Sequence, residues 1–263
     1  MKAIILSAGQ GRRLLPLTQD RPKALLPVSG KMVIEWQLDI LLAAGVDEIV
    51  IISGFRADLI EALLADKYAK YPGVRTIYNP FYDITDNLVS CWIAREVMDG
   101  DFLIINGDTM FERGLLDVVL GSAPAPVTVC TDTKETYDDD DMKVQTDGLR
   151  ILNISKKIEK QNIDAESIGL LYFRNDGVQR FKHAVEESLK DPIALKQWYL
   201  SVVDKLADEG LVNACPITGY RWCEIDYAED LAAAIGVIDV NAEQAGAAAV
   251  GIAEFEAARP HIA

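Results

Sequence analysis

Two glycines and four cations are concentrated in one short stretch near the N-terminus. The stretch reads SAGQGRRLLPLTQDRPKALLPV, and Gly9 and Gly11 directly follow an apolar run typical of a buried strand. Glycines have no Cβ atom, so their backbone N–H groups can approach a phosphate closely. A glycine pair alone is more often a plain turn, but the basic side chains beside it favour a phosphate-binding loop. These side chains are Arg12, Arg13, Arg21 and Lys23.

Carboxylates at two further places could hold a metal ion. Asp108 follows the expected strand Asp101–Asn106, which puts it at the carboxyl edge of a sheet, where open α/β sheets bind ligands. Glu224 and Asp226 are two residues apart on an expected strand and therefore share one face. Magnesium prefers one or two carboxylates completed by phosphate oxygens and water. An aspartate in a turn is common by itself, so these carboxylates matter only in combination with the basic loop.

The basic segment AGQGRRLLPLT…RPKALLPVSGK resembles the signature of the NTP-transferase family, which includes sugar-1-phosphate nucleotidylyltransferases and choline-phosphate cytidylyltransferases. The resemblance implies that Gly9, Gly11 and Arg13 hold the phosphates of an NTP. It also implies that Lys23 bridges the α-phosphate and the incoming phosphate. Arg12 stands where the family often has threonine or serine, and we assign it to nucleotide binding without a specific role.

The resemblance continues in WCEIDYAEDLAAA, which is similar to a Glu-Ile-Asp-Thr segment of the family. In the family the aspartate of this segment shares a metal ion with the aspartate at the strand end. The resemblance therefore implies that Asp226 and Asp108 hold Mg²⁺ together. Glu224 is expected to support the site and not to ligate the ion, and Asp230 is expected to act at the start of the following helix.

Three other segments resemble the choline-phosphate cytidylyltransferase-like branch: YNPFYDITDNLVSCWIAR, MKV with SKKI, and ESIGLLYF. The resemblance implies that Asn87 and Ser90 face the base, although such residues are also ordinary helix caps. A carbonyl near Ala8 or the side chain of Asn87 would accept the exocyclic amine of cytosine. The remaining residues assigned to the acceptor are Lys143, Lys156 and Glu166.

Alternating strands and helices predict an α/β fold with a doubly wound, mostly parallel, Rossmann-like sheet, similar to the GT-A-like nucleotidyltransferase fold. After about residue 124 short connections predict a small antiparallel extension. We expect one domain over 1–240, with a nucleotide-binding half at 1–123, an acceptor-binding half at 124–240 and a tail at 241–263. The expected helices are Met32–Ala44, Ala57–Lys70, Asp86–Met98, Val178–Lys190, Trp198–Glu209 and one from Tyr227.

Composition narrows the function classes further. The formal net charge of −15, from 41 acidic and 26 basic residues, argues against a nucleic-acid partner. Two histidines argue against a histidine-based metal site or triad, and four scattered cysteines are expected to be reduced core thiols. No apolar run approaches the ~20 residues of a membrane helix, so we expect a cytoplasmic protein that can form homo-oligomers. The acidic run Asp138–Asp141 is expected to be a solvated, flexible loop.

The expected reaction is attack by an anionic phosphate or phosphonate on the α-phosphorus of an NTP, with pyrophosphate as the leaving group. It needs no general base, and Mg²⁺, Lys23 and Arg13 would neutralise the developing charge. CTP with a phosphocholine-like acceptor is the first choice; a sugar-1-phosphate uridylyl-, thymidylyl- or guanylyltransferase is the alternative. A dinucleotide dehydrogenase is disfavoured because Leu14 stands where GxGxxG needs its third glycine. Trp198, Tyr199, Tyr220 and Trp222 could box a quaternary amine or belong to the core.

Overall fold

The computed structural model describes residues 1–238, which fold around one nine-stranded sheet. The strand order is β5-β4-β1-β6-β11-β8-β12-β10-β9. Two small antiparallel pairs, β2 with β3 and β7 with β13, lie outside this sheet. The strands are β1 Lys2–Ser7, β2 Pro27–Val28, β3 Lys31–Met32, β4 Glu48–Ser53, β5 Val74–Tyr78, β6 Phe102–Asn106, β7 Thr109–Phe111, β8 Val127–Asp132, β9 Lys143–Asp147, β10 Arg150–Ser155, β11 Ala165–Phe173, β12 Val212–Pro216 and β13 Trp222–Glu224.

The sheet is mixed, so the prediction of a mostly parallel sheet is wrong. Strands β5, β4, β1 and β6 are parallel, as expected for βαβ units. Strand β11, however, runs antiparallel to both β6 and β8 inside the same sheet. A tight turn at Gly148, with φ of 62°, joins β9 to β10 and leaves no room for a crossover helix. The antiparallel strand β11 therefore lies inside the sheet and is not a separate extension of it.

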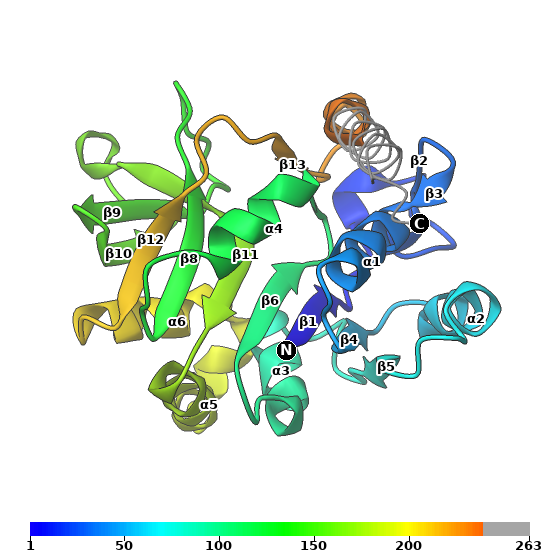
Figure 1. Ribbon diagram of the computed structural model, residues 1–263, viewed down its shortest axis with the longest axis horizontal. Helices are drawn as coiled ribbons and strands as arrows, with labels where there is room; N and C mark the ends of the chain where they lie inside the picture. The colour runs from blue at the N-terminus through cyan, green and yellow to red at the C-terminus, as the bar shows by residue number, and fades with distance from the viewer. Residues whose placement is uncertain (239–263) are drawn as a thin grey trace, which may run out of the picture.

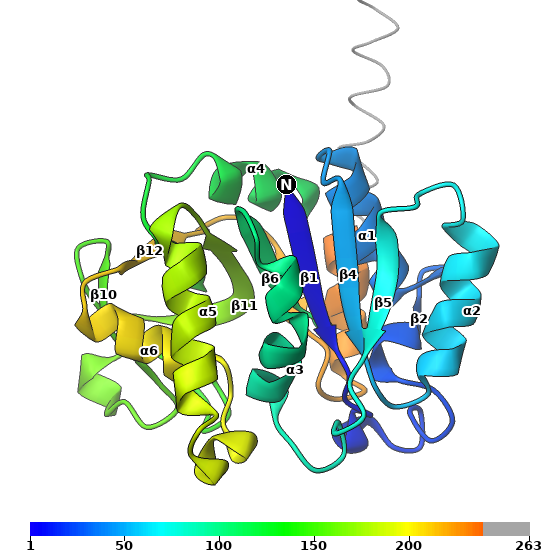
Figure 2. The same cartoon turned by 90° about the horizontal axis from the view of Figure 1, so that it is seen from below.

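Helices cover both faces of the sheet, which confirms the predicted α/β class (Figures 1 and 2). Alternate residues of β1 point to opposite faces: Ile4 packs in one buried cluster, while Ala3 and Ile5 pack in the other. The first cluster includes side chains of α3, α5 and α6, and the second includes those of α1, α2 and α4. The helices are α1 Val33–Ala43, α2 Ala57–Lys67, α3 Asn87–Ile93, α4 Arg113–Leu120, α5 Asp176–Ser188 and α6 Leu200–Asp208.

A third, smaller core joins the N-terminal basic segment to the last described helix, 230–238. Leu14 and Leu26 from the basic segment pack with Val237 of this helix and with Ile225 of the turn after β13. The helix expected from Tyr227 thus begins three residues later, and the predicted tail at 241–263 lies outside the described residues. This core fixes the turn after β13 against the basic loop. Across residues 1–238, no helix has both the length and the apolarity that crossing a membrane requires.

Candidate active site

The carboxyl ends of β1 and β6 lie side by side because the two strands are parallel neighbours. Beyond β6, the Gly107 N–H donates to the Leu6 carbonyl at 2.9 Å. A Cβ atom at Gly107 would lie 2.8 Å from the same oxygen, so only glycine permits this approach. Asp108 follows directly and is thereby held beside the glycine-rich loop that leaves β1. The strand-end carboxylate and the basic loop therefore meet.

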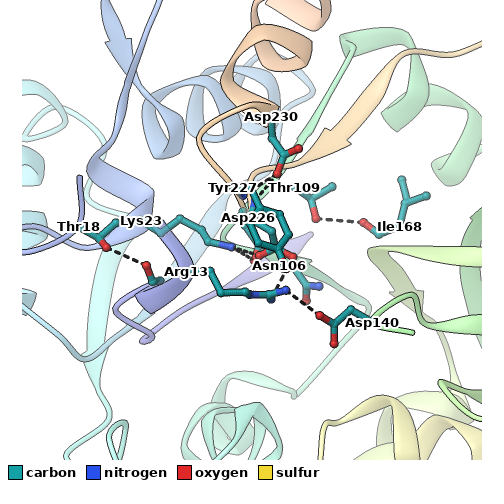
Figure 3. Close-up of polar contacts among 12 residues, drawn as sticks. Arg13, Thr18, Lys23, Asn106, Thr109, Asp140, Ile168, Asp226, Tyr227 and Asp230 are labelled. Carbon is teal, nitrogen blue, oxygen red and sulfur yellow. Dashed lines mark hydrogen bonds and ion pairs between the residues drawn. The ribbon is translucent and has the colours of Figure 1, made fainter. Parts of the chain in front are cut away.

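Lys23 lies between the two predicted metal-binding carboxylates. Its Nζ donates to Asp108 Oδ2 at 2.8 Å and to Asp226 Oδ1 at 2.5 Å, and its side chain is 13% exposed (Figure 3). Burial alone would lower the pKa of Lys23, but the two carboxylates outweigh burial and raise it. The ammonium is thus charged at neutral pH and offsets one of the two negative charges of Asp108 and Asp226.

A turn built on Asp230 positions Asp226. Asp230 Oδ2 accepts the N–H groups of Asp226 at 2.8 Å and Tyr227 at 2.7 Å, while Ile225 N–H donates to the Asp108 carbonyl at 3.1 Å. Strand β13 ends at Glu224, so Asp226 lies just beyond the strand on which it was predicted. Asp230 therefore does more than start a helix, because it fixes the backbone that carries Asp226.

Arg13 extends the network towards the acidic loop 138–141. Its Nη2 lies 3.1 Å from Asp226 Oδ2, and its Nη1 donates to Asp140 Oδ2 at 3.0 Å. Figure 3 shows Arg13 passing between these two carboxylates. Burial opposes the charge on Arg13, but contacts with Tyr227, Asp226 and Asp140 raise the pKa of its guanidinium. The guanidinium thus spans two separate segments of the chain.

Two adjoining cavities follow the basic loop. The first, of about 290 Å³, is lined by Gly9, Gly11, Arg12, Arg13, Lys23, Asp108 and Asp226, among others. The second, of about 280 Å³, shares Gly9 with the first and is also lined by Ala8, Asn79, Asp86, Asn87 and Ser90. The residues predicted to bind an NTP therefore line two adjoining cavities, with cations around the first and amide, hydroxyl and carboxylate groups around the second.

Some polar groups that line the second cavity already make hydrogen bonds within the protein. Asn87 Oδ1 accepts the Tyr199 N–H at 2.9 Å, and Ser90 Oγ accepts from Asn79 Nδ2 at 3.1 Å. The Ala8 carbonyl accepts the Phe55 N–H at 2.9 Å. Ser90 can still donate its own proton, and the Asn87 oxygen predicted to accept a base amine already accepts one hydrogen bond and keeps a second lone pair.

A third cavity of about 160 Å³ opens on the other side of Asp108 and Asp226 and is lined by Lys156, Glu166, Trp198 and Glu224 as well. Burial raises the pKa of Glu166 to about 7, opposed by Lys134 and assisted by Asp141. Burial, together with Asp108 and Asp226, raises the pKa of Glu224 to about 8. Two carboxyls that readily gain a proton thus face this cavity.

Lys143 is the predicted acceptor residue that the structure places elsewhere. Its side chain is buried, and its Nζ donates to the carbonyl oxygens of Asp138 at 2.5 Å, Asp141 at 3.4 Å and Lys156 at 3.1 Å. Because it makes these three hydrogen bonds to backbone carbonyl oxygens, the Lys143 ammonium stabilises the loop. Lys156 lies at the cavity itself, with its Nζ 4.1 Å from the centre of the Trp198 ring.

The structure also places the other predicted side chains. Arg12 lines the first cavity, is exposed and pairs with Asp83 of the loop before α3. Tyr199 is buried in the core at the wall of the third cavity, whereas Trp222 donates to Asp132 Oδ2 at 2.7 Å and does not line that cavity with Trp198. Asp140 was expected to be solvated but contacts Arg13. The acidic run carries no spacing signal for that contact, which depends on β8 and β9 both pairing with β11.

One observation indicates that Asp108 and Asp226 are suited to bind a divalent cation. Asp108 Oδ1 is buried and has no hydrogen-bond partner within residues 1–238. A buried carboxylate oxygen without a partner is costly, and a cation would satisfy it. No group of three or more His, Cys, Asp or Glu side chains able to hold a metal occurs in the described part of the chain. Two carboxylates with substrate phosphates are nevertheless sufficient for magnesium.

Known proteins resemble this chain in sequence and in fold. The chain is 28% identical over 233 residues to CMP-5'-(3-aminopropyl)phosphonate synthase of Streptomyces rubellomurinus, covering 86% of this chain and 37% of that protein. It is 31% identical over 119 residues to UTP--glucose-1-phosphate uridylyltransferase AglF of Haloferax volcanii, covering 45% of this chain and 48% of that protein. The solved CTP:phosphocholine cytidylyltransferase of Streptococcus pneumoniae shares its fold, with a TM-score of 0.73, 24% identity and coverage of 90% and 98% of the two chains.

The chain spans about a third to a half of the length of the first curated relatives it matches. The family match is broader and covers residues 2–236, which include the basic loop, Asp108 and Asp226. The chain therefore belongs to the nucleotidyl transferase family.

Proposed function

We propose that this protein transfers CMP from CTP to a small phosphate or phosphonate and releases pyrophosphate. One observation carries the proposal: Lys23 joins Asp108 to Asp226 where the phosphate cavity of about 290 Å³ meets the acceptor cavity of about 160 Å³. Both cavities include these two carboxylates in their walls. A reaction between an NTP and an anionic acceptor needs cationic charge at such a junction.

Alignment and charge neutralisation are sufficient for this chemistry. The glycine-rich loop and Arg13 would hold the phosphates of the NTP, and Lys23 would stabilise the negative charge that moves during the transfer. Mg²⁺ held by Asp108 and Asp226 would supply further charge neutralisation when bound. An acceptor phosphate is already anionic at neutral pH, so no side chain has to remove a proton from it.

Cytosine is supported by the polar groups around the second cavity. Asp86 lines this cavity and begins α3 without a capping hydrogen bond from its side chain, so its carboxylate can accept the exocyclic amine. Ser90 can donate to a ring acceptor, because its oxygen already accepts from Asn79. Uracil would present a carbonyl to Asp86, at a cost of roughly 1–3 kcal/mol for unpaired groups. A sugar-1-phosphate uridylyl-, thymidylyl- or guanylyltransferase is the alternative.

The acceptor is proposed to be phosphocholine-like, with a cationic group beside its phosphate. Lys156 at one wall suits the phosphate, and Glu166 with the exposed Trp198 suits an amine. A sugar phosphate has no cation to pair with Glu166, so it would leave that carboxylate with only its ion pair to Lys134 Nζ, at 3.0 Å.

The test is pyrophosphate release for CTP, UTP, dTTP and GTP, each combined with phosphocholine, 2-aminoethylphosphonate and glucose-1-phosphate. The proposal expects CTP with an amine-bearing acceptor to give the highest kcat/KM. Asp86→Asn should lower the ratio of CTP to UTP kcat/KM by about tenfold, the equivalent of one lost hydrogen bond to a charged group. Asp83→Asn, in the same loop, is the matched control. Preference for UTP or dTTP with the sugar phosphate would move the protein to the alternative.

A further inference from the structure

The acidic loop 138–141 is anchored and not freely solvated. The buried Lys143 ammonium bonds to the carbonyl oxygens of Asp138 and Asp141 within the loop and to that of Lys156 outside it. Lys134 Nζ adds a second anchor, 2.7 Å from Asp141 Oδ2. These contacts hold the first and last residues of the loop, so its tip has a defined position.

Asp140 at this tip joins two cations from different parts of the site. Asp140 Oδ2 accepts from Arg13 Nη1 at 3.0 Å, and Asp140 Oδ1 accepts from Lys156 Nζ at 3.2 Å. Arg13 lines both the phosphate cavity and the acceptor cavity, and Lys156 and Asp140 line the acceptor cavity. The two cations lower the pKa of the Asp140 carboxyl, so it is ionised at neutral pH. One anion therefore bridges two cations of the acceptor cavity, and one of these cations also faces the phosphate cavity.

We infer that Asp140 occupies the place of the acceptor phosphate in the empty enzyme and is displaced when that phosphate binds. This inference rests on the proposed function. A phosphate or phosphonate has three oxygens and up to two charges, so it can engage both cations more strongly than one carboxylate does. The Asp140 side chain is 62% exposed, and exposed ion pairs contribute little free energy, so displacing Asp140 costs little free energy.

The geometry gives Asp140 two opposed effects. It holds Arg13 and Lys156 in place before substrate arrives, which makes it a positioning residue. It also competes with every anion that binds to these cations, so it weakens their apparent affinity. Competition is reciprocal, because whatever binds the cations must release the loop tip.

The test compares Asp140→Asn with Asp139→Asn. Asp139 is exposed and makes no ion pair within residues 1–238, so its substitution removes the same charge from the same loop. Calorimetry with inorganic pyrophosphate and with phosphocholine measures binding without turnover. Asp140→Asn should tighten phosphocholine binding about two- to fivefold, the size of one exposed ion pair, and Asp139→Asn should change it less.

Three results would each overturn the inference: weaker binding in Asp140→Asn, equal effects of the two substitutions, or an effect of Asp140→Asn confined to kcat. The binding assay also separates the inference from the proposed function. Tighter phosphocholine binding by Asp140→Asn with no turnover on any acceptor would support the displacement and reject the proposed reaction. Turnover with unchanged binding would do the reverse.

Discussion

The two sides of the active site are built from different kinds of structure. On the nucleotide side, parallel strands β1 and β6 end next to each other and deliver the glycine-rich loop and Asp108 to one edge. On the acceptor side, Glu166 lies within β11, while Asp140 and Lys156 lie on loops beside antiparallel strands. The first arrangement follows from strand direction alone, whereas the second depends on which strands pair.

The chemical balance of the two sides also differs. On the nucleotide side Lys23 bridges Asp108 and Asp226, and Asp108 Oδ1 alone keeps no hydrogen-bond partner among the side-chain atoms of these three described residues. The acceptor side keeps buried carboxyls with raised pKa values at Glu166 and Glu224. A preorganised charge network is suited to transition-state stabilisation, and an unbalanced pocket is suited to selecting a charged ligand. Substitutions on the nucleotide side should therefore mainly lower turnover, and substitutions on the acceptor side should mainly change the selection of the ligand.

The largest effect is expected for the carboxylates shared by both sides. Asp108→Asn or Asp226→Asn should lower kcat at least ~100-fold, because each removes a proposed metal ligand and one partner of Lys23. Nucleotide binding should be retained better than turnover. Steady-state kinetics over a range of Mg²⁺ concentrations, with calorimetry for CTP, make the comparison. Near-normal Mg²⁺-dependent rates in both variants would reject the assignment.

The next effect separates the two cations of the nucleotide side. Lys23→Ala should lower kcat about 100-fold with a smaller change in KM for CTP, because the buried ammonium matters most as charge moves. Arg13→Ala should affect both parameters, because guanidinium groups also grip phosphates in the ground state. Lys31→Ala, outside the cavities, serves as the charge control. A Lys23→Ala change confined to KM would contradict this division of roles.

A smaller effect is expected at Asp230, which does not line the phosphate cavity. Asp230→Asn should reduce kcat about tenfold, because the amide holds the Asp226 backbone less firmly than the carboxylate does. A raised Mg²⁺ requirement with an unchanged melting temperature would identify a positioning role. Equal loss of stability and activity would instead indicate general unfolding of the turn.

The smallest effect concerns stability on the acceptor side. The folded-state pKa of Glu166, about 7, exceeds its ordinary value of 4.5, so the folded chain holds an extra proton between these pH values. Stability should consequently fall as pH rises from 4.5 to about 7. Glu166→Gln should flatten this decline in the free energy of unfolding, measured by urea titration at several pH values. The exposed Glu61→Gln variant should keep the full slope.

The nucleotide side was largely predictable from sequence because its determinants are local. Glycines after one buried strand and an aspartate after another strand parallel to it lie at the same edge of a sheet, as they do after β1 and β6. The apolar run before Gly9 was expected to be a buried strand, and it forms β1, Lys2–Ser7. The two histidines and the scattered cysteines also limited the chemistry, and all four cysteines are free.

The acceptor side depended on tertiary structure. Short connections after residue 124 predicted antiparallel strands, but not that β11 would insert between β6 and β8. Because β11 lies there, Glu166 lines the acceptor cavity and Lys143 Nζ donates to backbone carbonyl oxygens. Asp140 likewise lies close enough to Arg13 to form an ion pair. The sequence by itself determined the α/β class, the family and the sheet edge that carries the glycine-rich loop and Asp108, because these depend on local spacing and strand direction. Only the tertiary structure decided which charges neutralise each other, because ion pairs between segments more than a hundred residues apart depend on strand order.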